Sequence, residues 1–278
     1  MRGVFVCVAL LVLCCVAVHA AINPRRELRV LMIHTPWGNI EEPASVAASM
    51  LGIIVSVINF FKMRKLLARL PKGSWMNYPA KSLWFCTLYG VGAMSVSSVL
   101  FHAHDDHYFT EGLDYTTAIW FIGFMSCASF MRCFRIYKTI TQRVTAYIII
   151  LIPLCCHSTY MFFFKWDYGW NMKFGSFFVA VTLVMWYGFC AYYLLFSKPP
   201  VSHFKWALAG IAALTAFAPA EIWDFIPIWQ TIDGHSVWHV GMDLFGVLFA
   251  EFVMRDVEYF ASKESDPLMT EQDFLHKN

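Results

Sequence analysis

Charged residues are scarce in this chain of 278 residues. Only 14% of the residues are Asp, Glu, Lys or Arg, whereas 59% are hydrophobic and 18% are aromatic. This composition excludes an ordinary soluble globular domain. The formal net charge is +2 and no basic stripe follows the sequence, so nothing favours a nucleic-acid partner. We therefore predict an all-α integral membrane protein that contacts membrane lipids and no nucleic acid.

Signals of an oxidising lumen are also missing from the polar loops. Three of the nine cysteines lie in the first 20 residues, and the others lie in or at the ends of apolar segments. No disulfide framework is therefore implied. The chain has no Asn-x-Ser/Thr acceptor either, so glycosylation gives no independent indication of topology.

The first residues, "MRGVFVCVALLVLCCVAVHA", contain one arginine, a short apolar run and small residues before Ala21. This pattern predicts a cleaved signal peptide over residues 1–20, followed by a short lumenal segment over residues 21–41. The alternative is a signal anchor that stays as an additional helix. The apolar run is short for a membrane span, which favours cleavage.

Seven later segments are long and apolar enough to be transmembrane helices of about 20 residues each. Their predicted bounds are Glu42–Phe61, Ser82–Phe101, Tyr115–Phe134, Val144–Phe164, Phe174–Phe196, Phe204–Trp223 and Ser236–Met254. Residues 42–254 thus form one seven-helix domain. We expect residues 255–278 to be a cytosolic tail, in which the mixed-charge part after Arg255 is disordered.

Loop charge predicts the orientation of the bundle. The loops "KMRKLLARLPK" and "RCFRIYKTITQR" are strongly basic, whereas "HAHDDHYFTEGLD" and "DFIPIWQTIDGH" contain no Lys or Arg. Because basic loops stay in the cytosol, the N-terminus is predicted to be lumenal and the C-terminus cytosolic.

Three histidines reach the predicted lumenal side at similar depth. His235 and His239 lie four residues apart and share a helix face, and Ser98 and His102 do the same. Three neutral imidazoles with one open position are typical of a catalytic zinc site, in which the ion lowers the pKa of a bound water to about 7. We therefore predict Zn²⁺ ligation by His102, His235 and His239.

The other histidines and the buried acids have simpler interpretations. We assign interfacial or capping roles to His34, His157 and His203. Weaker candidates for ligands lie in the acidic loop, namely His104 and His107. Structural roles at lumenal helix ends are expected for Glu42, Glu221 and Asp224, although Glu42 could also line the site.

Asp243 continues the face of His235 and His239 one turn deeper into the membrane. One hypothesis is that its carboxylate holds a metal-binding imidazole in orientation. The alternative is a buried acid that is paired with a hydroxyl of another helix.

Several motifs resemble those of known membrane hydrolases. "SSVLFH", "TEGLDY" and "DGHSVWH" look like the motifs of the CREST superfamily of seven-helix hydrolases. "EEPASV" and "EIWDFIPIWQTIDGHSVWH" resemble the signatures of its GPI-anchor phospholipase family, post-GPI attachment to proteins factor three. Members usually carry a cysteine-rich lumenal region before the first helix, whereas residues 21–41 contain no cysteine.

The resemblance implies a zinc-dependent phospholipase A2-type enzyme that acts on GPI-anchored proteins. It implies zinc on the three histidines, with Ser98 and Asp114 as catalytic residues beside it. Ser98 could donate a hydrogen bond to the oxyanion, and Asp114 could transfer the proton. The segment from His102 to Asp114 is one residue longer than is usual in the family. Asp105 and Asp106 are therefore alternative candidates for the catalytic role of Asp114.

In the family, this reaction removes the sn-2 acyl chain of a GPI anchor during lipid remodelling. The expected location is an ER or Golgi membrane, with the active site facing the lumen. Two alternatives stay open. One is a CREST hydrolase of another lipid, such as an alkaline ceramidase. The other is a non-enzymatic seven-helix receptor.

Overall fold

The computed structural model describes residues 32–35, 38–40, 42–71, 89–103, 108–134, 139–196, 202–222 and 225–264. The predicted signal peptide, most of the lumenal segment and the last 14 residues therefore lie outside the described residues, as do His104, His107, Asp105, Asp106 and Asp224.

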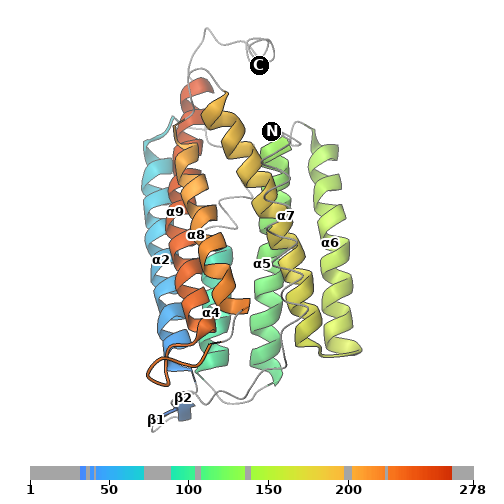
Figure 1. Cartoon of the computed structure of the whole chain (residues 1–278). Coiled ribbons are helices and arrows are strands. Elements are labelled where there is room, and N and C mark those ends of the chain that lie inside the picture. Colours follow the sequence, from blue (N-terminus) through green and yellow to red (C-terminus); the bar gives the residue numbers. More distant parts are fainter. Residues whose placement is uncertain are drawn as a thin grey trace.

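Within these residues, a short hairpin precedes seven helices (Figure 1). The hairpin consists of β1 (Ile33–Thr35) and β2 (Gly38–Ile40), which pair antiparallel with Ile33 opposite Ile40. The helices are α2 (Pro43–Arg69), α4 (Val91–His102), α5 (Tyr108–Phe134), α6 (Ile140–Phe163), α7 (Tyr168–Leu195), α8 (Phe204–Ile222) and α9 (Gly234–Glu264).

Five of these helices, namely α2, α5, α6, α7 and α9, are long and apolar enough to cross a membrane by length and composition. The chain is therefore an integral membrane protein with a helical bundle, as the sequence predicts. The described part of α4 is shorter, with 12 residues, and α8 has 19. Cleavage of the signal peptide, the number of spans and their orientation stay predictions.

Six helices form a closed ring in which each packs against the next, in the order α2, α4, α5, α7, α8, α9 and back to α2. α6 packs against α5 and lies at one edge of the bundle (Figure 1). The largest fully buried side chains lie where α7, α8 and α9 meet, and they include Trp186, Phe204, Phe249 and Phe252. The indole of Trp186 donates to Ser129 Oγ at 2.8 Å, so α5 joins this core through a satisfied polar contact.

The last helix continues ten residues beyond the predicted end at Met254, and the prediction of disorder is wrong for residues 256–264. The physical reason is an ion pair at this end of the bundle. Asp256 is fully buried and accepts from Arg132 Nε at 2.8 Å and Nη2 at 2.7 Å. His203 Nε2 lies 3.0 Å from the same carboxylate. These contacts hold the C-terminal part of α9 against α5 and the start of α8.

Two of the histidines for which the sequence predicts an interfacial or capping role have partners on other helices. His203 belongs to the buried contact with Asp256. His157 is buried inside the bundle, where its Nε2 lies 2.9 Å from Asn171 Oδ1 and its ring stacks on Phe174. Both imidazoles therefore join neighbouring helices. For His34, only the backbone pairing in β1 is described.

Candidate metal centre

All six helices of the ring bring a polar side chain to the same end of the bundle, the end near β1 and β2 in Figure 1. The side chains come from segments that are distant in the sequence: Glu42 before α2, His102 in α4, Asp114 in α5, Tyr168 in α7, Glu221 in α8, and His235 and His239 in α9. The ring thus ends in a polar cluster, although its helices are apolar along most of their length.

Local sequence signals place the histidines at helix ends. Asp233 caps α9, because its Oδ1 accepts from the backbone N–H of Ser236 at 2.8 Å and the Ser236 hydroxyl accepts from the backbone N–H of Asp233 at 3.1 Å. This reciprocal cap begins α9 just before His235, so His235 and His239 occupy its first two turns. His102 is the last residue of α4.

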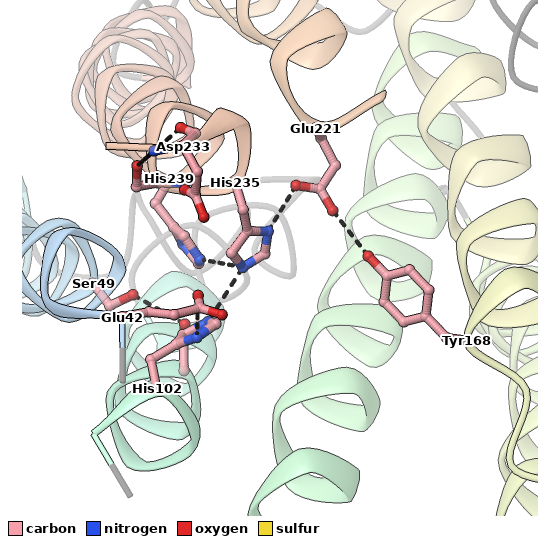
Figure 2. A network of polar contacts seen from close by, with 10 residues as sticks. Glu42, Ser49, His102, Tyr168, Glu221, Asp233, His235 and His239 are labelled. Carbon is pink, nitrogen blue, oxygen red and sulfur yellow. Dashed lines mark hydrogen bonds and ion pairs between the residues drawn. The ribbon is translucent and has the colours of Figure 1, made fainter. Parts of the chain in front are cut away.

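The three imidazoles converge on one point (Figure 2). His235 Nε2 lies 3.2 Å from His102 Nε2 and 3.0 Å from His239 Nε2. Each histidine offers a nitrogen within 4.8 Å of the other two, and His102 is buried. The structure therefore brings together the three residues that the sequence predicts as ligands.

Two carboxylates hold the outer nitrogens of these rings. Glu42 Oε2 lies 2.9 Å from His102 Nδ1, and Glu221 Oε2 lies 2.7 Å from His235 Nδ1. Glu221 Oε1 in turn accepts from the Tyr168 hydroxyl at 3.2 Å (Figure 2). Carboxylates in these positions fix the tautomer of each ring, with the proton on Nδ1 and the lone pair on Nε2.

This arrangement fits a metal ion. Because each Nδ1–H faces a carboxylate, the neutral rings of His102 and His235 turn their lone pairs toward each other. Two lone pairs 3.2 Å apart repel unless a cation lies between them. Two nitrogen ligands on one tetrahedral zinc are about 3.3 Å apart for bonds of ~2.0–2.1 Å. The nitrogen spacing and the oriented tautomers thus match the requirements of a three-histidine site.

The predicted catalytic residues lie at the same end of the ring. Ser98 is buried one turn before His102, and its Oγ lies 3.0 Å from Ser49 Oγ of α2. The buried carboxylate of Asp114, in the second turn of α5, is within electrostatic reach of His102 and His235. Both residues are therefore near the histidine cluster, and their catalytic roles stay predictions.

Asp243 lies one turn beyond His239, where it packs against Gly52 of α2 and is buried. Its Oδ2 has no hydrogen-bond partner among the residues that the structure describes. The carboxylates that contact the outer nitrogens belong instead to Glu42 and Glu221. Orientation of an imidazole by Asp243 stays a prediction without a contact that supports it.

The sequence analysis therefore misses the functional importance of Glu221 and Tyr168. One signal for Glu221 is present in the sequence, because it is the only acid in the apolar segment Phe204–Ile222, and such acids in membrane helices usually have a partner. The partnership with Tyr168, 53 residues earlier, is visible only once α7 and α8 pack together.

A comparison with known protein families gives a match over residues 33–257 to the Per1-like family. The chain belongs to the Per1-like family. The match includes all of the histidine cluster and the carboxylates that hold it. It confirms the predicted relationship to the GPI-phospholipase family.

Curated relatives are distant but cover most of the chain. GPI-specific phospholipase A2-like PGAP3 from Xenopus laevis is 27% identical over 232 residues, which are 81% of this chain and 67% of that protein. The Schizosaccharomyces pombe protein PER1 homolog is 28% identical over 81% of this chain and 65% of its own length. Human GPI-specific phospholipase A2-like PGAP3 is 25% identical over 81% and 67%. The chain thus spans about two thirds of the length of these relatives. No solved structure matches it.

Proposed function

We propose that this Per1-like protein is a zinc-dependent phospholipase A2-type hydrolase that removes the sn-2 acyl chain of GPI-anchored proteins in the lumen of the ER or Golgi. The observation that carries the proposal is the convergence of three histidine Nε2 atoms, together with the carboxylates that face the outer nitrogens of His102 and His235. The names of the relatives, GPI-specific phospholipase A2-like PGAP3, supply the substrate class.

His102, His235 and His239 would hold the metal, with Glu42 keeping the ring of His102 in orientation and Glu221 that of His235. A bound zinc ion supplies activation of water and polarisation of an ester carbonyl. Ser98 lies one turn from His102, and Ser49 can donate to its Oγ. The Ser98 hydroxyl proton is then available to stabilise the negative charge that develops on the carbonyl oxygen.

Asp114 supplies a carboxylate near the reacting groups. In this proposal it accepts a proton from the attacking water and delivers it to the leaving alcohol, as a general base and then a general acid. Its position in α5 places it across the ring from the histidines of α9. An acid in this position completes the residues that ester hydrolysis requires.

Exposed apolar side chains at this end of the bundle fit a site at the membrane surface. Phe109 and Phe163, at the ends of α5 and α6, are exposed, as are Ile226 and Trp229 in the loop that connects Glu221 to His235. Aromatic residues are enriched at membrane interfaces. The acyl chains of the substrate would therefore stay in the bilayer while the glycan and the protein stay in the lumen.

Lipid mass spectrometry of GPI anchors tests this function in cells that lack their own GPI-phospholipase. The cells would be complemented with the wild type, with His235→Ala, or with Val240→Ala as a matched control at an exposed position of the same helix. We expect the wild type and Val240→Ala to restore sn-2 deacylation. His235→Ala should accumulate in the membrane without restoring it.

Full restoration by His235→Ala would overturn the proposed role of the metal centre. Unchanged GPI lipids with wild-type protein at normal levels would overturn the proposed substrate. In that second case, ceramide turnover in the same extracts would show whether the protein hydrolyses a different lipid.

A further inference from the structure

A charged cleft lies between α2 and α9, at the end of the bundle opposite the histidines. Its volume is about 320 Å³, at the lower end of the ~300–1,000 Å³ that small-molecule sites occupy. The floor is formed by the apolar side chains of Leu66 and Met254. The rim carries the charged side chains of Lys62, Lys65, Arg69, Glu251, Arg255 and Glu258.

This cleft is separate from the metal centre. Glu42 and Lys62 are 20 residues apart along α2, which corresponds to about 30 Å of helix. His235 and Glu251 are separated by about 24 Å of α9. A ligand in the cleft would therefore touch the two helices that hold Glu42, His235 and His239, but at their far ends.

The charges of the cleft do not cancel. Four basic side chains face two acids, which leaves an excess of two positive charges. Glu251 is occupied by Arg255, which it contacts at 2.6 Å, and the ring of Trp206 lies 5.4 Å from the Arg255 guanidinium. Among the described residues, this pair is the only ion pair recorded within the cleft. Glu258 is the second acid of the cleft, beside the three basic side chains of Lys62, Lys65 and Arg69.

The cleft also lies at the depth where the bundle changes from apolar to charged. One turn deeper, Ile58 and Phe61 of α2 and Val247 of α9 are exposed as in a lipid-facing surface. The charged residues begin at Lys62 and Glu251. A ligand with a phosphate group at the membrane surface and acyl chains along the helices would match both parts.

We propose that this cleft binds the phosphate-bearing head group of an anionic membrane phospholipid. Lys65 and Arg69 of α2 and the pre-positioned Arg255 of α9 would contact the phosphate oxygens, because basic pockets between membrane helices recognise such head groups. The acyl chains would lie against Ile58, Phe61 and Val247. This site is independent of the proposed hydrolase activity.

Binding of a short-chain lipid by the purified full chain in detergent tests the proposal. The probe is dioctanoyl phosphatidylinositol 4-phosphate, and calorimetry gives its affinity beside those of dioctanoyl phosphatidylcholine, inositol 1,4-bisphosphate and inorganic phosphate. Arg69→Gln should weaken binding of the probe about fivefold, and Lys65→Gln with Arg69→Gln about 30-fold. Glu258→Gln should tighten it.

Arg64→Gln is the matched control, because Arg64 is exposed on the same helix but does not line the cleft. We expect this variant to bind the probe within about twofold of the wild type. The proposed site would be overturned if Arg64→Gln and Arg69→Gln lowered the affinity for the probe equally. It would also be overturned if phosphatidylcholine bound as tightly as the probe. Binding of inorganic phosphate or inositol bisphosphate as tight as that of the lipid would overturn the assignment to a lipid. If the α2 variants do not fold, the Glu258→Gln variant still tests the proposal. Binding of the probe by this variant that is no tighter than binding by the wild type would overturn it.

Discussion

Removal of the Glu221 carboxylate should weaken metal binding while the three histidines stay in place. Glu221 Oε2 lies 2.7 Å from His235 Nδ1, and its side chain is mostly buried. A hydrogen bond to a charged group contributes about 1.5–3 kcal/mol, which corresponds to a factor of about 10–150 in a binding constant. Loss of a carboxylate that holds a ligating histidine typically costs about 10–100-fold in metal affinity.

We therefore expect zinc to bind about tenfold more weakly to Glu221→Gln and about 100-fold more weakly to Glu221→Ala. Glutamine keeps an oxygen that can accept from Nδ1, whereas alanine leaves the ring without a partner. Tyr168→Phe removes only the hydroxyl that donates to Glu221, so its effect should stay below about tenfold.

Competition with a chromophoric chelator on purified protein measures these affinities. Glu251→Gln is the matched control, since it removes the same charge at the far end of α9. Equal zinc affinity of the wild type and a correctly folded Glu221→Ala would refute the argument that this carboxylate orients His235.

Three further predictions concern stability. Arg132→Met should destabilise the protein by about 3–5 kcal/mol in thermal unfolding, because it removes the guanidinium that pairs with the buried Asp256 charge. A smaller loss in the double variant Arg132→Met/Asp256→Leu would confirm this cause, and an equal or larger loss would contradict it. Gly241→Ala should cost about 1–3 kcal/mol of stability, because its Cβ would overlap the side chain of Phe217 in α8. Gly246→Ala is the control, since its Cβ would meet nothing closer than 3.7 Å, and equal effects of the two changes would contradict the packing argument. Asp167 caps α7, and a hydrogen bond from Lys165 and the charge of this lysine lower the pKa of its carboxyl. The contribution of Asp167 to the free energy of unfolding should therefore be complete above the ordinary pKa of 3.8. It should disappear as the pH falls through the lower pKa of the folded state. Asp167→Asn keeps the cap and should remove the contribution of Asp167 to the acid dependence of unfolding. An unchanged acid dependence in this variant would contradict the role assigned to the Asp167 carboxylate.

The helices were predictable because apolar runs of membrane length leave few alternatives. Their ends were less predictable, for local reasons. α6 begins at Ile140 rather than Val144 because Thr139 and Gln142 form a capping box. α7 begins six residues earlier than predicted because Asp167 caps it. These capping residues are visible in the sequence, but hydropathy alone does not locate them.

Long-range partners could not be predicted in the same way. The end of α9 depends on Asp256 and its contact with Arg132, 124 residues away in the sequence. The spacing of His235 and His239 predicts one face of the metal centre, and His102 follows from topology. The carboxylate partners depend on how the ring closes, so Glu221 could be placed beside His235 only from the packing of α8 on α9.

Hydrolysis by the purified, reconstituted protein tests the central claim most directly. The substrate is a GPI-anchored lipid with a labelled sn-2 acyl chain, and the readout is the labelled fatty acid released before chelation, after chelation and after addition of zinc. We predict release by the wild type, loss on chelation and recovery with zinc, with no recovery for His239→Ala. Release that persists after complete removal of metal, or that survives in a folded His239→Ala protein, would contradict a reaction at the three-histidine centre.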